Sequence, residues 1–174
     1  MRPSVPLLAS EEQLYTAALR ALMRRAYSVH EMRVYLERRS GDPDLAHKIV
    51  GRLKAEKLID DARYALDFAR QRAQTRKQGR YRIARELRTR GVPDRQIEAA
   101  IAQTFAETDE ALLVQKMIER KLRSVRGPLE ARQIAALQRL LLRAGFDAET
   151  IRSQMRAALA RRGTAVPDLP DEGD

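Results

Sequence analysis

The sequence predicts an all-α protein. Glycine and proline are scarce, with eight and seven copies among 174 residues, and they fall between segments with helical apolar periodicity. The dominant residue types, Ala, Leu, Arg, Glu and Gln, are good helix formers. No stretch alternates apolar and polar residues for long enough to make a strand. A chain of this length forms one ordinary domain or a few small repeated modules, and it needs no disulfide or metal to fold.

The first three predicted helices each combine a start signal with an apolar stripe. The first covers residues 11–25 behind an N-cap at Ser10. Ser28 and Glu31 have the spacing of a capping box for the second. The third starts near Pro43, because proline is favoured as the first helical residue. The predicted inward-facing residues are Leu14, Ala17, Ala18, Ala21, Leu22, Val29, Met32, Leu36, Leu45, Ile49 and Leu53.

The next three helices follow the same pattern. Asp60 is the predicted N-cap of the fourth. Gly79 precedes the fifth, and Gly91 closes it as a left-handed residue. Pro93 opens the sixth. The predicted inward-facing residues are Ala62, Ala65, Phe68, Ala69, Ile83, Ala84, Leu87, Ile97 and Ile101.

The last three helices are separated by clear breaks. Thr108 is the predicted N-cap of the seventh, and Gly127 with Pro128 interrupts the chain after it. The eighth stops at Gly145, and Asp147 caps the ninth. The predicted inward-facing residues are Leu113, Met117, Ile118, Ile134, Leu137, Leu141, Ile151, Met155 and Leu159.

Nine predicted helices in three sets of three indicate an internal repeat. Residues 90–97 match residues 144–151, since both place Gly, an apolar residue and Ile at the same offsets. Repeats of this length form helical arrays in which each unit needs a neighbour to bury its apolar face. We therefore expect three-helix repeats at residues 10–59, 60–106 and 107–162. Flexible or disordered ends are predicted at residues 1–9 and, because of its proline and acidic content, at residues 163–174.

The residues that usually carry catalysis are few. Cysteine is absent, which excludes a disulfide framework, a thiol nucleophile and a cysteine metal site. The two histidines, His30 and His47, lie far apart in polar helical settings. Asp60 and Asp61 read as a cap and a first-turn acid rather than as a catalytic pair. No glycine-rich phosphate loop or hydrolase motif is present, so we expect no enzyme, no cofactor and no metal.

The charge balance favours an acidic partner. Lys and Arg exceed Asp and Glu by 34 to 24, giving a net charge of +10. Nearly all the cations are arginines, which bind phosphate and carboxylate in a planar, bidentate way. A GC-rich genome would also raise the arginine content. The partner classes that fit this charge are nucleic acid, a nucleoprotein and an acidic protein surface. No apolar run approaches the ~20 residues of a membrane span, and no signal peptide is apparent, so we expect a cytoplasmic protein.

The densest basic cluster lies between residues 70 and 90, where Glu86 is the single acid. Its nine members are Arg70, Arg72, Arg76, Lys77, Arg80, Arg82, Arg85, Arg88 and Arg90. Helical spacing predicts that Arg82, Arg85 and Arg88 face outward together. The alternative is a solvated helix face with an Arg82–Glu86 pair. A second, more diluted basic patch consists of Lys116, Arg120, Lys121, Arg123 and Arg126.

Three stretches of the sequence resemble the bacterial RecX regulatory proteins. RRAYSVHEMRVYL, residues 24–36, is similar to the family pattern R-x-x-S-x-x-E-L-x-x-x-L with Met32 for Leu. LIDDARYA, residues 58–65, is similar to L-[IL]-D-D-x-x-F-A with Tyr64 for Phe. GRYRIARELRTRGV, residues 79–92, is similar to K-G-x-x-[RK]-[IL]-x-x-E-L-x-x-K-G-[IV], with Gln78 and Arg90 in place of the two lysines. The resemblance spans about residues 14–101 and weakens over the third predicted repeat.

This resemblance implies both a fold and a role. The fold is three tandem three-helix repeats forming an elongated, curved helical array, and we expect a monomer. The role is regulation of DNA repair and recombination: RecX proteins lodge in the groove of the RecA recombinase filament on DNA and inhibit its ATPase, coprotease and strand-exchange activities. DNA itself is a second expected partner, bound weakly and without sequence preference. The rival interpretations are a helix-turn-helix transcription regulator, which short helices and basic charge also fit, and an enzyme with an unrecognised site.

Overall fold

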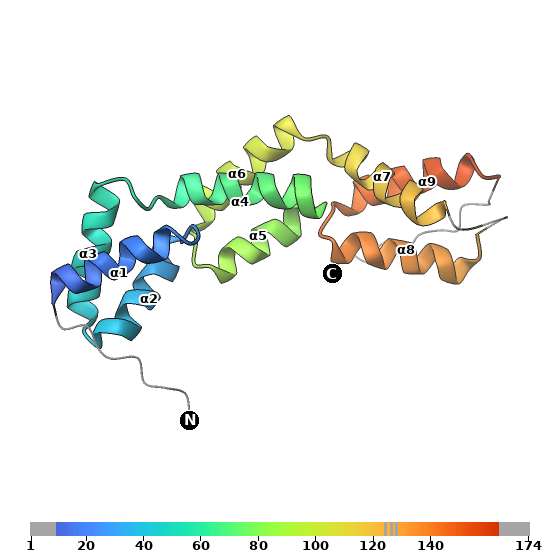
Figure 1. The fold of residues 1–174 in the computed structure, drawn as a ribbon. Coiled ribbons are helices and arrows are strands. Elements are labelled where there is room, and N and C mark those ends of the chain that lie inside the picture. The colour runs from blue at the N-terminus through green and yellow to red at the C-terminus, as the bar shows by residue number, and fades with distance from the viewer. Residues whose placement is uncertain (1–9, 124, 126, 128, 164–174) are drawn as a thin grey trace, which may run out of the picture. The chain divides into compact units, whose positions relative to one another are not determined.

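The computed structural model describes residues 10–163 apart from residues 124, 126 and 128. Within these residues it consists of nine α-helices and no strand, so the all-α prediction is confirmed (Figure 1). The helices are α1 (Glu11–Leu22), α2 (Val29–Ser40), α3 (Pro43–Ala55), α4 (Asp61–Arg76), α5 (Arg80–Thr89), α6 (Asp94–Glu107), α7 (Glu110–Leu122), α8 (Ala131–Arg143) and α9 (Ala148–Ala160). The end segments predicted to be flexible, residues 1–9 and 164–174, lie outside the described residues.

The helices pack into two compact units. Unit 1 comprises residues 1–68 and 86–100, and unit 2 comprises residues 69–85 and 101–174. Helices α4, α5 and α6 therefore contribute to both units. The predicted repeat boundaries near residues 60 and 107 follow the order of the helices and remain a proposal.

Unit 1 is built around α1, α2 and α3, whose predicted start signals are confirmed. The Ser10 hydroxyl accepts from the backbone N–H of Gln13 at 3.2 Å. Ser28 and Glu31 form the predicted capping box, and Pro43 is the first residue of α3 behind an Asp42 cap. The buried apolar residues are Leu14, Ala18, Ala21, Met32, Leu36, Ala46, Ile49, Val50, Leu53 and Ile59. Four predicted core residues, Ala17, Leu22, Val29 and Leu45, are only partly buried.

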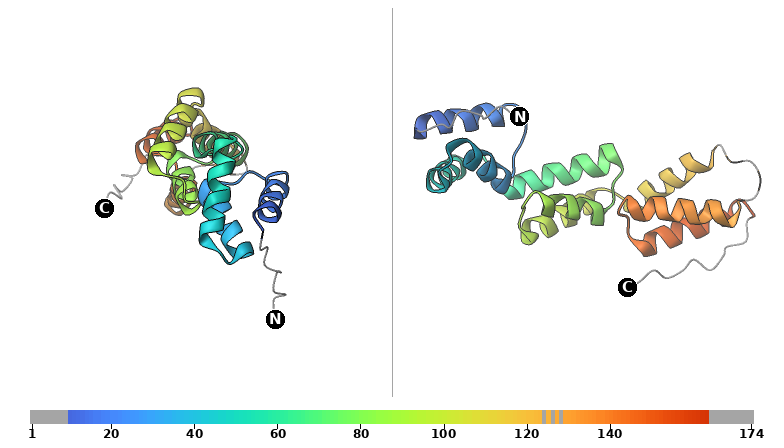
Figure 2. Two further views of the ribbon diagram at one scale, coloured as in Figure 1. Left: turned by 90° about the vertical axis from the view of Figure 1, so that its left-hand side faces the viewer. Right: turned by 90° about the horizontal axis from the view of Figure 1, so that it is seen from below.

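Unit 2 has its core between α7, α8 and α9, which lie side by side in Figure 1 and in the right-hand view of Figure 2. All nine residues predicted to face inward on these helices are buried. The predicted cap of α7 is wrong by one residue: Asp109 Oδ1 accepts from the backbone N–H of Leu112 at 3.0 Å, so Asp109 and not Thr108 is the N-cap. A carboxylate in this position also meets the positive end of the helix dipole.

The middle helices bear out most of the predicted stripes. Ala65 and Ala69 of α4 are buried together with Ala73, and Ile83 and Leu87 of α5 are fully buried. Phe68, Ala84 and Ile101 are only partly buried, and Ala62 is exposed. It lies on the same face of α4 as the buried alanines but in the first helical turn, where that face is open to solvent.

Two glycines, Gly91 and Gly145, each allow two helices to approach closely, and these contacts explain the internal sequence match. Gly91 ends α5 with φ of 70°, and a Cβ there would overlap the ring of His30 at the start of α2. Gly145 follows α8 with φ of 83°, and a Cβ there would overlap Arg82 at the start of α5. Each site requires both a left-handed residue and the absence of a side chain. One contact lies within unit 1 and the other within unit 2, so residues 90–97 and 144–151 resemble each other because they make the same junction.

Candidate functional site

The nine basic residues predicted as contact candidates divide into exposed and partly buried groups. Four are exposed: Arg76, Lys77, Arg85 and Arg88. Five are partly buried: Arg70, Arg72, Arg80, Arg82 and Arg90. Arg88 and Arg90 belong to unit 1 and the other seven belong to unit 2. The cluster is therefore continuous in the sequence, but it is not a uniform solvent-exposed face.

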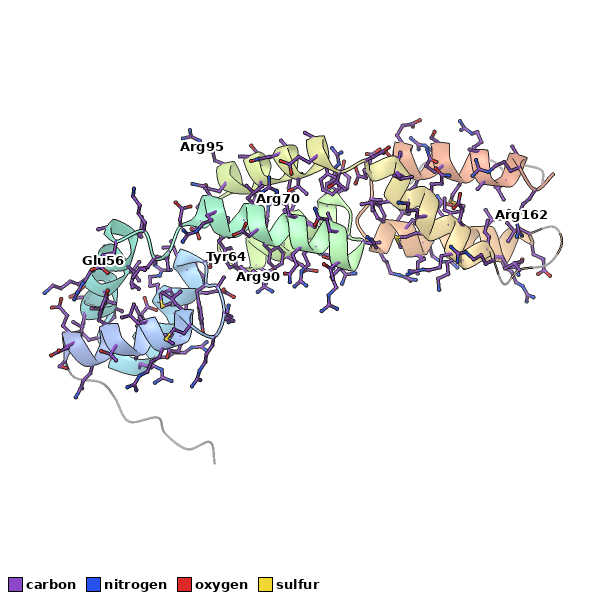
Figure 3. All side chains as sticks on the ribbon, turned by 45° about the horizontal axis from the view of Figure 1, so that its top comes forward. Glu56, Tyr64, Arg70, Arg90, Arg95 and Arg162 are labelled. Atoms are coloured by element: carbon purple, nitrogen blue, oxygen red, sulfur yellow. The ribbon has the colours of Figure 1, made fainter. Side chains whose placement is uncertain are left out.

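Arg70, labelled in Figure 3, joins α4 to α6 through a bidentate ion pair. Its Nε lies 3.1 Å from Glu107 Oε2 and its Nη2 lies 2.7 Å from Glu107 Oε1. The hydrogen bonds from Arg70 have a larger effect on the pKa of Glu107 than burial does, and they lower it. Arg70 is thus held by the protein's own carboxylate.

Arg80 joins α5 to α7 in a similar way. Its Nε donates to Glu110 Oε2 at 2.8 Å, and the side chain of Glu110 is only 7% exposed. The guanidinium carbon lies 5.3 Å from the centre of the Phe105 ring. A nearly buried carboxylate needs such a cation, so the main role of Arg80 is structural.

Arg90 belongs to a network around Glu31. Its Nη1 lies 3.3 Å from Glu31 Oε1, and Arg25 Nη1 lies 2.8 Å from Glu31 Oε2. Burial raises the pKa of Glu31, but the hydrogen bonds from Arg25 and Ser28 and the nearby positive charges outweigh it and lower the pKa overall. The Ser28 hydroxyl also donates to the Arg90 carbonyl oxygen at 2.6 Å. These contacts tie the start of α2 to the end of α5.

The prediction that Arg82, Arg85 and Arg88 all face solvent is wrong for Arg82. Its guanidinium reaches the C-terminal end of α8, where Nη1 lies 3.4 Å from the Arg143 carbonyl oxygen, and the side chain is partly buried. Arg85 and Arg88 are exposed as predicted. Arg88 forms an ion pair with Asp94 at 2.7 Å, but both partners are more than half exposed, so a ligand can compete for it.

The cations best placed to meet a partner lie at the end of α4 and on α5. Arg76 ends α4, and Lys77 follows it with a positive φ of 52°. The Lys77 ammonium donates to the Gln74 carbonyl oxygen at the end of the helix. Arg76, Lys77 and Arg85 are all exposed in unit 2, where they can meet phosphate or carboxylate groups.

The second predicted patch follows α7 and its end. Lys116, Arg120, Lys121 and Arg123 are exposed. Arg126 lies outside the described residues. None of the four exposed cations forms an ion pair with an acid in the described part of the chain. This patch stays a second candidate surface in unit 2.

The sequence prediction missed a group of arginines on α1, just after α1 and on α2. Arg20, Arg24 and Arg39 line a common hollow in unit 1. In the sequence they are separated by acidic residues such as Glu31 and Glu37, which dilute the local charge. No local sequence signal marks this group, because Arg24 lies beyond the end of α1 and Arg39 belongs to α2.

The two histidines and the pair Asp60 and Asp61 lie in unit 1, and the two aspartates make hydrogen bonds that support the fold. His30, His47 and Asp61 line a hollow of about 360 Å³ in unit 1. Asp60 caps α4 as predicted, accepting from the backbone N–H of Arg63 at 2.9 Å. Asp61 accepts from the backbone N–H of Val29 at 2.9 Å, a contact to α2 that the sequence did not reveal. Among the described residues, no three His, Asp or Glu side chains are arranged to hold a metal ion.

None of the helices in the described ranges is both long and apolar enough to cross a bilayer.

Similarity to known proteins covers most of the chain. Residues 15–53 and 60–101 match the family models for the first and second three-helix domains of RecX. The regulatory protein RecX of Halorhodospira halophila is 38% identical over 151 residues, which cover 86% of this chain and 91% of that protein. The regulatory protein RecX of Oceanobacillus iheyensis is 31% identical over 137 residues, covering 79% of this chain and 50% of that protein. The crystal structure of RecX from Lactobacillus salivarius has the same fold, with a TM-score of 0.77, 20% identity and coverage of 87% of this chain and 97% of that one.

Proposed function

Because this chain belongs to the RecX family of regulatory proteins, we propose that it binds the RecA–DNA nucleoprotein filament and inhibits its ATPase, recombinase and coprotease activities. Family membership supports the regulatory role itself. The partner and the inhibition come from what the resemblance implies. On this proposal the protein acts in the cytoplasm as a non-catalytic monomer that limits DNA repair and recombination and the SOS response.

The observation that carries the proposal at the level of residues is the exposed basic surface of unit 2. Arg76 at the end of α4, Lys77 after it and Arg85 on α5 are exposed. A filament of protein on DNA presents both acidic side chains and phosphates, and arginine binds either in a bidentate way. We therefore assign the first contact to these three cations, with Arg88 of unit 1 as a further candidate.

The partly buried arginines fit this assignment poorly. Arg70 and Arg80 already hold Glu107 and Glu110, and Arg90 holds Glu31. Moving Arg80 to a partner would leave a nearly buried carboxylate without its cation, which is strongly unfavourable. These residues support the fold that presents the surface.

A pull-down with RecA tests the proposal. RecA filaments assembled on immobilised single-stranded DNA with a non-hydrolysable ATP analogue should retain the chain. RecA without DNA and nucleotide should retain much less, because the filament groove is then missing. Equal retention by both, or no retention by the filament, would contradict the proposal.

A second experiment distinguishes this function from the rival function, that of a helix-turn-helix transcription regulator. Such a protein places a recognition helix in the major groove and prefers one duplex sequence. Selection of duplexes from a random pool should therefore yield no consensus if the chain is a RecA regulator. A recovered consensus sequence would favour the transcription regulator.

A further inference from the structure

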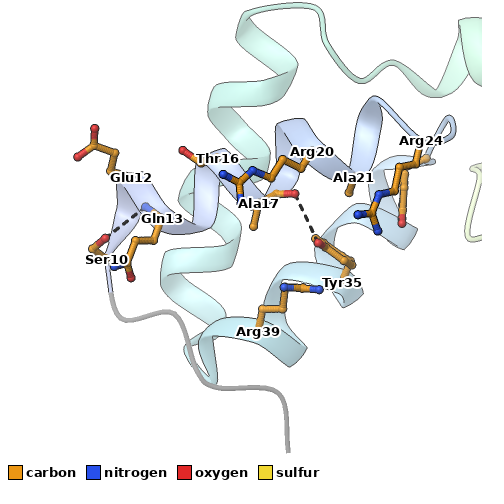
Figure 4. Close-up of a pocket in the computed structure, with 11 residues that line it drawn as sticks. Ser10, Glu12, Gln13, Thr16, Ala17, Arg20, Ala21, Arg24, Tyr35 and Arg39 are labelled. Carbon is orange, nitrogen blue, oxygen red and sulfur yellow. Dashed lines mark hydrogen bonds between the residues drawn. The ribbon is translucent and has the colours of Figure 1, made fainter.

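A hollow of about 700 Å³ lies between α1 and α2 in unit 1 (Figure 4). Its walls carry three arginines, two tyrosines and several hydrogen-bond donors. The residues are Ser10, Glu12, Gln13, Thr16, Ala17, Arg20, Ala21, Arg24, Tyr27, Tyr35 and Arg39. The lining thus holds three guanidinium groups and one carboxylate, that of Glu12, so the hollow has a net positive charge.

None of these three arginines is neutralised by the protein. Within the described residues, Arg20, Arg24 and Arg39 form no ion pair with an acid. Arg20 lies in the last turn of α1, and Arg24 follows two residues after that helix ends. Figure 4 shows the side chains of all three along the hollow that Tyr35 also lines. A bound anion would relieve the repulsion that this arrangement creates.

The tyrosines give the hollow a fixed wall. The Tyr27 and Tyr35 rings lie 5.8 Å apart with an interplanar angle of 57°. The Arg25 guanidinium stacks 3.6 Å from the centre of the Tyr27 ring, and the Arg39 guanidinium stacks 4.7 Å from that of Tyr35. The Tyr35 hydroxyl donates to the Ala17 carbonyl oxygen at 3.4 Å. A stacked guanidinium keeps its N–H edge free, so Arg39 is held ready for a bidentate contact.

A simpler explanation accounts for part of this arrangement. Arg39 is in the last turn of α2, and Arg24 follows the end of α1. Cations in such positions are favoured by the helix dipole. That effect explains each arginine singly, but it does not explain why three of them converge on one hollow lined with further donors.

We propose that this hollow binds the phosphodiester backbone of a single-stranded nucleic acid. Its volume exceeds that of one small anion, and its donors extend along two helices, which fits a chain of phosphates. A concave site admits one flexible strand more readily than a convex duplex, and basic grooves with aromatic side chains are typical of single-strand binding. The proposal rests on the proposed function only for the source of the strand, which would be the DNA of the filament.

The test uses the full chain and a fluorescent oligothymidylate, with no RecA present. Binding is measured by fluorescence anisotropy at several salt concentrations. Each lost single-strand contact removes about 0.7 from the log–log salt slope, so the double variant Arg20→Ala/Arg24→Ala loses about 1.4. Relative to binding at about 1 M salt, that slope makes the variant bind about 25-fold more weakly than wild type near 0.1 M salt. An oligothymidylate with uncharged methylphosphonate linkages should not bind the wild-type chain.

The control variant is Arg95→Ala/Arg132→Ala, which removes the same charge from exposed positions on α6 and α8. Figure 3 shows Arg95 projecting away from the helices. The control should bind like the wild type. Equal weakening by both double variants would reduce the effect to net charge and overturn the site. Tighter binding of labelled polyglutamate than of oligothymidylate would also overturn the proposal, because the ligand would then be an acidic protein.

The anisotropy measurements contain no RecA, so they can be compared with a separate assay of RecA inhibition. A chain that inhibits RecA but binds no oligothymidylate would refute this site and leave the proposed function intact. A chain that binds oligothymidylate through the hollow but never inhibits RecA would refute the proposed function alone.

Discussion

Individual arginines of this protein play different roles although they look alike in the sequence. Arg80 is bound to a nearly buried carboxylate, whereas Arg76 is exposed at the end of α4. Glu110 lies 30 residues from Arg80, so no local pattern reveals the pair. Charge density therefore located the basic segment, but it could not show which cations are held in ion pairs within the fold.

Glu31 is expected to make stability depend on acid pH. Its pKa in the folded chain lies below the ordinary value of 4.5. Such a group stabilises the fold above the unfolded pKa, and this contribution is lost as the pH falls through the folded pKa. Glu31→Gln should lower the free energy of unfolding by about 1–3 kcal/mol at neutral pH, because a hydrogen-bonded charge is lost.

Urea unfolding of wild type and Glu31→Gln at a series of pH values, from neutral down into acid, checks this prediction. The difference between the two proteins should shrink in acid, where the wild-type carboxyl takes up a proton. A difference of the same size at every pH would show that the ion pairs of Glu31 contribute nothing.

Gly91 is expected to tolerate no side chain. Gly91→Ala places an L residue in the left-handed region, which costs about 1–2 kcal/mol, and its Cβ overlaps the His30 ring. Gly127 provides a matched control, since its φ is 80° but nothing lies within 4 Å of an added Cβ. Thermal melts should show Gly91→Ala as clearly the more damaging of the two. Equal losses would mean that the junction with His30 yields easily.

Whole helices follow the sequence more closely than single contacts do. Helix existence, order and most start signals were predicted from capping residues and apolar periodicity, which act within one or two turns. The errors concern features that the neighbouring residues in the sequence do not determine, namely the choice between two N-caps and the burial of one residue. Thr108 and Asp109 are both good caps, and the chain uses the carboxylate. Ala62 continues the apolar stripe of α4 but lies where the stripe is uncovered.

The phase of α5 gives a test of the element as a whole. Leu87 is fully buried, so Leu87→Ala should cost about 2–5 kcal/mol through lost burial and a residual cavity. Arg85 is exposed, so Arg85→Ala should change stability by no more than about 0.5 kcal/mol. Denaturant unfolding of both variants measures the contrast. Similar losses would show that the assigned inward face of α5 is wrong.

At the scale of the whole molecule, one type of junction occurs twice. A glycine after the second helix of one three-helix set meets the start of the second helix in the preceding set, in unit 1 through Gly91 and in unit 2 through Gly145. The sequence showed the match between the two segments but not its cause, because both contacts join residues far apart in the chain. The α1–α2 hollow was missed for the same reason, since it exists only once two helices are packed together.

The central claim is that the chain inhibits RecA through the exposed cations of unit 2. The direct measurement is the DNA-dependent ATPase of RecA, titrated with wild type, with Arg76→Glu/Arg85→Glu and with the control Arg95→Glu/Arg132→Glu. Wild type and control should inhibit equally, whereas the first variant should need roughly tenfold or more protein for the same inhibition, because like charges now face the filament's phosphates or carboxylates. If that variant melts normally and its dose curve matches the wild type, the claim is contradicted, and the contact moves to the patch from Lys116 to Arg123.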